Sequence, residues 1–155
     1  MQKLLITFGT RPLAQRISKM LQDKFEILFS TSEEVPSFLA SNYLKIPTGV
    51  NPTYAHEILK LSLDRQVDHV LPLGISEIQT ISEAKILFEE YGIQLLCPDR
   101  ETLEEVFVLE NPNSSVELSL FFNGKSLNNT KDFDGGISGL YAVSDEGDDV
   151  ALCTI

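Results

Sequence analysis

The residue types that could do chemistry in this chain gather first in a turn that follows the apolar run Lys3–Phe8. The turn Gly9-Thr10-Arg11-Pro12-Leu13-Ala14 occupies the place of the fingerprint G-x-G-x-x-G/A, whose glycines let a backbone approach a pyrophosphate. Arg11 stands where the middle glycine would be, and its side chain obstructs that approach. Arg11 could instead offer its guanidinium to an anion at a helix N-terminus, or the segment could be a tight turn with a solvated arginine.

A second group follows the apolar run Val67–Leu73, in the sequence Gly74-Ile75-Ser76-Glu77. Glu77 could face the crevice at the carboxyl ends of parallel strands, where open α/β sheets bind ligands. Alternatively, Ser76 caps a helix and Glu77 complements the helix dipole. The ligand-binding candidates are therefore Gly9, Thr10, Arg11, Gly74 and Glu77. We expect no catalytic residue among them.

The remaining reactive residue types match no known site pattern. His56 and His69 have no partners at metal-ligand spacing, and Cys97 has no adjacent histidine, which favours core packing over a nucleophile. The second predicted strand ends in Ser30-Thr31, with no acid for a ribose hydroxyl before Glu33, so NAD is not expected. Five aspartates do not fit the calcium-loop pattern and are expected in solvated turns: Asp132, Asp134, Asp145, Asp148 and Asp149. No metal and no cofactor are predicted.

Short apolar runs alternate with helical periodicity up to about residue 106. Strands are expected near residues 3–8, 26–30, 67–73 and 93–97. Because strands that alternate with helices form right-handed crossovers, the pattern predicts a Rossmann-like wound parallel sheet with helices on both faces.

Four features between the strands refine this expectation. A short helix over 36–42 leads into a brief strand at 43–46, and Asn51-Pro52 is expected to start a helix, with Asn51 as its cap. One apolar stripe predicts a single helix that carries Ile78, Ile81, Ala84, Phe88 and Tyr91. Asp99 is expected to cap a helix over Arg100–Phe107.

After residue 115 the apolar period changes to two. Val116–Phe122 ends at Asn123-Gly124, a strong hairpin signal, and a second hairpin turn lies between Gly139–Val143 and Val150–Ile155. We therefore expect a C-terminal antiparallel β meander that extends the sheet or covers its edge. The expected organisation is an α/β domain over residues 1–110 and an acidic, β-rich extension of the same domain over 111–155. The joint is expected at Asn111–Ser115.

Composition excludes several classes of protein. The 155 residues include 23 acids and 12 Lys and Arg, a net charge of −11, which argues against nucleic-acid partners. No apolar run approaches the roughly 20 residues that span a bilayer, and the N-terminal run is too short for a signal peptide. Two distant cysteines are expected as reduced thiols in a cytoplasmic protein. Phe121 and Phe122 must point to opposite faces of their strand, and the second face needs cover. The following hairpin could cover it in a monomer, or paired meanders could cover it in a homodimer, which we expect.

Several segments occur in an order that resembles a known family. Lys3–Thr10 is similar to its opening strand and glycine turn, and Asn51-Pro52 precedes a helix that leads to Val67–Pro72, similar to "D-x-[VL]-[IL]-P". Gly74–Glu77 matches its acidic loop, and Phe88–Pro98 matches "F-x-x-x-G-I-x-[VL]-x-x-P". Residues 1–106 thus resemble the pre-ATP-grasp domain, the N-terminal α/β domain of biotin-carboxylase-like and carbamoyl-phosphate-synthase-like ATP-grasp ligases. In that family the domain shapes part of the substrate site, which implies one crevice for the five candidate residues.

The chain departs from the family after Val106, where an acidic segment of about 50 residues is too short for an ATP-grasp domain. Three hypotheses for function remain open. The chain could be a stand-alone binding or accessory protein without catalysis, and we expect its ligand to be a small anion. It could be a subunit of a split ligase whose ATP-grasp partner is a separate polypeptide, or a small-molecule or nucleotide-binding enzyme of its own.

Overall fold

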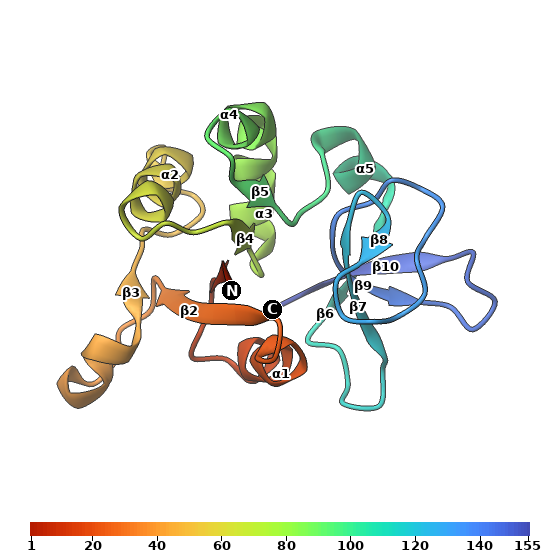
Figure 1. The fold of residues 1–155 in the computed structure, drawn as a ribbon, viewed down its shortest axis with the longest axis horizontal. Helices are drawn as coiled ribbons and strands as arrows, with labels where there is room; N and C mark the ends of the chain where they lie inside the picture. The colour runs from red at the N-terminus through yellow and green to blue at the C-terminus, as the bar shows by residue number, and fades with distance from the viewer.

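The computed structural model describes residues 1–155, and its N-terminal part is built on a sheet of five parallel strands (Figure 1). The strands follow the order β3-β2-β1-β4-β5, so the chain winds outward in both directions from β1. Their bounds are β1 (Gln2–Ile6), β2 (Phe25–Thr31), β3 (Leu44–Lys45), β4 (His69–Leu71) and β5 (Gln94–Leu95). The predicted parallel α/β sheet is confirmed, with β1 and β4 as direct neighbours.

Helices cover both faces of this sheet, as predicted. Because successive side chains of β1 point to opposite faces, Leu4 and Ile6 belong to the core cluster that includes α1, and Leu5 belongs to the cluster under α2, α3 and α4. The helical segments are α1 (Pro12–Leu21), η1 (Ser37–Asn42), α2 (Tyr54–Asp64), α3 (Ile75–Ile81), η2 (Ser82–Ala84), α4 (Lys85–Glu90) and α5 (Arg100–Glu105). None of these helices is long and apolar enough to cross a membrane.

Two helix predictions are corrected. The expected single helix across Ile78–Tyr91 is broken by the 3-10 turn η2, where the Ser82 hydroxyl donates to the Gln79 carbonyl and competes with regular helical bonding. The expected helix start at Asn51-Pro52 is also wrong, because α2 begins at Tyr54. The Asn51 carboxamide oxygen accepts from the Thr53 N–H at 2.9 Å and so stabilises the turn before the helix.

The C-terminal part forms a separate mixed sheet with the order β6-β10-β9-β7-β8. Its strands are β6 (Phe107–Glu110), β7 (Leu118–Phe122), β8 (Lys125–Ser126), β9 (Gly139–Val143) and β10 (Val150–Thr154). Both predicted hairpins are present, and Asn123 and Gly124 have the positive φ values of 50° and 80° that a tight hairpin turn requires.

β6 corrects the prediction for the end of the last helix. The helix ends at Glu105, and Phe107 begins a strand that pairs parallel to β10, so the sheet is not purely antiparallel. The β-branched Val106 and Val108 flank an aromatic residue, a composition that favours extended backbone. The second sheet therefore begins before the expected joint at Asn111–Ser115.

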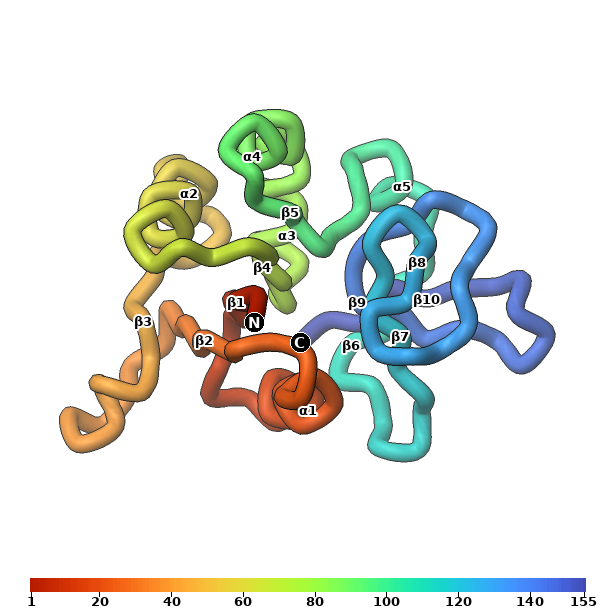
Figure 2. Tube along the Cα trace, in the orientation of Figure 1, coloured from red at the N-terminus to blue at the C-terminus, as the bar shows by residue number.

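Each of the two core clusters contains residues from both sheets. Leu118 and Leu120 pack into the α1 cluster, whereas Phe121 and Tyr141, on the other face of the second sheet, pack into the α2–α4 cluster. Figure 2 shows the C-terminal end of the chain running back from the second sheet toward the first. There the Ile155 N–H donates to the Leu73 carbonyl at 2.9 Å.

The aromatic pair behind the homodimer prediction is covered within one chain. Phe121 is fully buried beside Phe133 and Tyr141, and the partly buried Phe122 packs into the α1 cluster on the opposite face. The pair therefore does not require a second copy as cover, and the homodimer stays a prediction.

Candidate functional site

The carboxyl edge of the first sheet brings the five candidate residues together. Gly9, Thr10 and Arg11 lie in the turn from β1 to α1, and Gly74 and Glu77 lie at the start of α3 after the neighbouring β4. Since the carboxyl ends of parallel strands meet at one edge, the two turns are adjacent.

Phe8 joins the two turns. Its backbone is in the left-handed region (φ 50°), which is rare for an aromatic residue. Its ring lies so close to Gly74 that a Cβ atom there would be 2.5 Å from Phe8 Cε2. The Arg11 guanidinium lies 5.8 Å from the centroid of the same ring, within cation–π range. Phe8 therefore fills the space between the β1–α1 turn and the start of α3.

The Glu77 side chain is buried and held in place by hydrogen bonds. Its side chain is only 2% exposed, and Oε1 accepts from the Thr7 hydroxyl at 2.5 Å and from the Gly74 N–H at 3.2 Å. The Thr7 hydroxyl in turn accepts from the Leu73 N–H at 2.8 Å. Burial raises the pKa of Glu77, opposed by these hydrogen bonds. Glu77 thus caps its own helix and ties α3 to β1. Ser76 is not the cap, because the helix begins at Ile75 with Gly74 as N-cap.

Two residues of this buried network were not predicted from the sequence. Thr7 is a polar residue at the end of an otherwise apolar run, and that interruption is a signal that could have identified it. For Tyr54, on α2, the sequence contains no feature that would have identified it as part of this site. Its buried hydroxyl makes no hydrogen bond of acceptable geometry, and its pKa is raised well above the ordinary value, first by burial and then by the nearby Glu77 carboxylate.

Arg11 holds a carboxylate at the rim of the same edge. Its Nε and terminal nitrogen donate to the two oxygens of Glu33 at 2.9 and 2.8 Å, and the Thr10 hydroxyl adds a bond to Oε1 at 3.2 Å. The hydrogen bond from Arg11 lowers the pKa of Glu33. The Arg11 and Glu33 side chains are 42% and 33% exposed, so this ion pair is accessible to water and to solutes. Three groups contributed by residues 10 and 11 already form a carboxylate-binding fork.

Part of the backbone around this fork is already engaged in hydrogen bonds. The Gly9 N–H donates to the Ser30 carbonyl at 2.8 Å, and the Arg11 N–H donates to the Phe8 carbonyl. A Cβ on Gly9 would lie 2.6 Å from Phe29 Cβ, so packing against β2 accounts for this glycine. The N-terminus of α1, by contrast, has no side-chain cap, because Arg11 is the N-cap residue and directs its guanidinium to Glu33. The positive end of this helix dipole therefore lies beside the fork without a side-chain cap.

The histidine and cysteine side chains lie away from this edge or inside the core. His56 is exposed, whereas His69 is buried against Phe25, and burial lowers its pKa. Cys97 and Cys153 are free and buried, and burial raises their pKa values to about 12 and about 11. Both thiols are therefore neutral near pH 7 and unsuited to nucleophilic attack.

Among known proteins, no family model matches this chain, and neither does any curated protein. The resemblance to the pre-ATP-grasp domain accordingly rests on the order of its sequence motifs.

Proposed function

We propose that the protein is a stand-alone binding or accessory protein of the pre-ATP-grasp type, which holds a small anion beside Gly9–Arg11 and catalyses no reaction by itself. The observation that carries the proposal is the fork of Arg11 and Thr10, which already binds the carboxylate of Glu33 through three hydrogen bonds. A side chain with the chemistry of the expected ligand thus occupies the place where the ligand would bind.

A ligand anion can replace Glu33 at low cost. Solvent-exposed ion pairs contribute about 0–1 kcal/mol, and both members of this pair are partly exposed. A carboxylate or phosphate that displaces Glu33 keeps the paired donors of Arg11 and gains the uncapped N-terminus of α1. The net charge of −11 opposes binding only weakly, because exposed charges beyond a Debye length of about 8–10 Å are largely screened.

The chemistry of the neighbouring groups favours binding over catalysis. Glu77, the nearest buried carboxylate, is engaged by Thr7 and Gly74. The thiols of Cys97 and Cys153 are held protonated by burial. Free cysteines also fit a cytoplasmic location, where thiols stay reduced.

Calorimetric titration of the full chain with inorganic phosphate and with citrate tests the proposal. Arg11→Ala should abolish binding, because it removes two of the three donors of the fork and its only positive charge. Glu33→Gln should tighten binding about 2- to 5-fold, because it removes the competing carboxylate. Glu83→Gln is the matched control, since it makes the same charge change at the exposed ion pair with Arg100 on α5. Equal tightening in Glu33→Gln and Glu83→Gln, or full binding by Arg11→Ala, would refute the proposal.

A further inference from the structure

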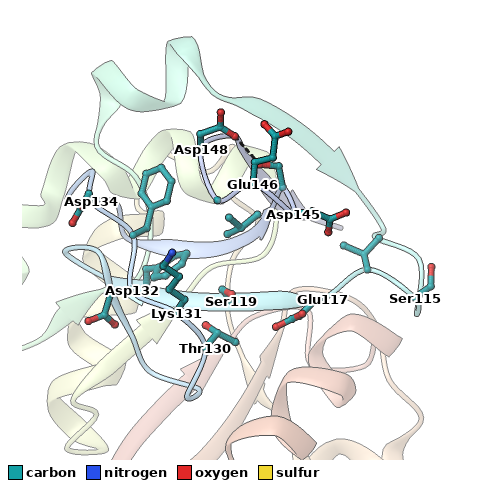
Figure 3. A pocket seen from close by; sticks show the side chains of 16 residues that line it. Ser115, Glu117, Ser119, Thr130, Lys131, Asp132, Asp134, Asp145, Glu146 and Asp148 are labelled. Atoms are coloured by element: carbon teal, nitrogen blue, oxygen red, sulfur yellow. Dashed lines mark hydrogen bonds between the residues drawn. The ribbon is translucent and has the colours of Figure 1, made fainter.

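A cavity of about 870 Å³ lies over the second sheet, far along the chain from the anion fork. Strand β7 lines it, together with the loop that follows β8 and the turn between β9 and β10 (Figure 3). One cationic side chain, Lys131, lines this cavity. Six of its lining side chains are carboxylates: Glu117, Asp132, Asp134, Asp145, Glu146 and Asp148. The cavity therefore has a formal charge of −5.

A hydroxyl without a protein partner faces this cavity. Ser119 is 6% exposed and lines the cavity, and its hydroxyl takes part in none of the side-chain hydrogen bonds of the protein. Figure 3 places the Ser119 side chain on β7, between Asp132 and Glu117 in this view and below Glu146 and Asp148. Because the rest of Ser119 is buried and its hydroxyl faces the cavity without a protein partner, this hydroxyl is free to accept a hydrogen bond from a ligand in the cavity.

The cavity walls are fixed by the fold. Asn128, in the loop after β8, accepts from the Leu120 N–H at 3.0 Å and donates to the Leu118 carbonyl at 2.9 Å, which ties that loop to β7. The opposite wall is a closed turn, because the Ser144 N–H donates to the Asp149 carbonyl at 2.8 Å. The hollow between them is thus a built feature of the second sheet.

The spacing of the carboxylates determines which class of cation fits the cavity. No three carboxylate, histidine or cysteine side chains converge closely enough to hold a metal ion. In Figure 3, Asp132 and Asp134 lie on one side of the hollow and Asp145 and Asp148 on another, so the negative charge is spread along its walls. None of the six carboxylates has a cationic partner within 4.0 Å. Dispersed and unpaired carboxylates suit an extended organic cation with several separated charges.

We propose that this cavity binds a linear aliphatic polyamine. The ammonium groups pair with carboxylates on the two walls, and one ammonium donates to the Ser119 hydroxyl. The methylene segments pack on the partly exposed apolar side chains of the lining, Val116, Phe133 and Val143. Lys131 is the one lining group that opposes the ligand.

Calorimetric titration of the full chain at low salt, with spermidine, putrescine and n-butylamine as probes, tests this site. Affinity should fall in that order, because each probe loses an ammonium group. Ser119→Ala should weaken spermidine binding about 2- to 10-fold by removing one hydrogen bond. Asp134→Asn and Asp145→Asn should each weaken it about 2- to 5-fold, and neither carboxylate has a hydrogen-bond role in the fold. Lys131→Gln should strengthen it by a similar factor.

The matched control is Glu104→Gln on α5, which removes one exposed charge outside the cavity. Affinity should be unchanged in this variant, and amide shifts in an NMR titration should map to β7 and the β9–β10 turn. Three results would each overturn the proposal. The first is a loss of spermidine affinity in Glu104→Gln equal to that in Asp134→Asn and Asp145→Asn. The second is displacement of spermidine by equimolar Mg²⁺. The third is tighter binding of a tetralysine peptide than of the tetra-amine spermine.

Discussion

Replacing Thr7 with valine removes the centre of the buried network that joins β1, β4 and α3. Thr7 is completely buried, and its hydroxyl donates to Glu77 at 2.5 Å while accepting from the Leu73 N–H at 2.8 Å. Valine has nearly the same shape, so Thr7→Val deletes both hydrogen bonds without creating a large cavity. A bond to a carboxylate contributes about 1.5–3 kcal/mol, and a buried N–H left unpaired costs about 1–3 kcal/mol.

The expected loss of unfolding free energy is therefore about 2.5–6 kcal/mol, a large share of the 5–15 kcal/mol typical of a domain. Urea denaturation followed by circular dichroism measures this loss as a shift of the midpoint at constant m-value. Thr80→Val is the matched control, because the Thr80 hydroxyl donates a single neutral bond to the Gly49 carbonyl at 2.6 Å. The control should lose about 1 kcal/mol. If Thr7→Val loses no more unfolding free energy than Thr80→Val does, the Thr7–Glu77 hydrogen bond does not stabilise the packing of α3 against β1.

Three further predictions concern the same edge of the sheet. Burial raises the folded-state pKa of Glu77 above its ordinary 4.5, so its contribution to stability is full at low pH and is lost as the pH rises through the folded-state pKa. Glu77→Gln should therefore become more stable relative to the natural protein as the pH rises above 4.5 in urea titrations, and a trend of the opposite sign would contradict this. Gly49→Ala should cost more than about 2 kcal/mol in the same assay, because its Cβ would lie 2.6 Å from the Ser76 carbonyl carbon and closer still to the Glu77 nitrogen. A phosphate-release assay with ATP and Mg²⁺ should detect no turnover by the purified chain, and turnover that Arg11→Ala removes would assign catalysis to this edge.

The arrangement of the first sheet follows from local patterns. Lys3–Phe8 and Val67–Leu73 are apolar runs of strand length, each followed by a glycine turn and then by helical spacing. Parallel winding places the carboxyl ends of such strands at one edge, which is why the two candidate turns could be predicted to meet. The hairpin at Asn123-Gly124 could also be predicted from the sequence, because this type of turn depends on two adjacent residues.

The contacts that decide the roles of the site residues are not local. Glu33 reaches Arg11 from the loop after β2, and Glu77 reaches Thr7 across 70 positions of the chain. No spacing rule connects such residues before the fold brings them together. β6 was missed for a related reason, since Phe107 follows a helical, acidic segment and its pairing partner Ala151 lies more than 40 residues later.

The acidic cavity illustrates the same limit. Four of its six carboxylates, Asp132, Asp134, Asp145 and Asp148, were predicted in solvated turns, and these four residues are exposed as expected. Strand β7, the loop after β8 and the β9–β10 turn come together only in the folded sheet, and only there does the Ser119 hydroxyl lie among carboxylates.

The most direct test of anion binding at Gly9–Arg11 is an NMR titration of the ¹⁵N-labelled full chain with inorganic phosphate. Saturable shifts are expected for the amides of Thr10, Leu13 and Ala14, at the fork and the uncapped start of α1. They should occur at lower phosphate concentration in Glu33→Gln and be absent in Arg11→Ala. Shifts that leave these amides unaffected, or that persist unchanged in Arg11→Ala, would contradict the proposed function.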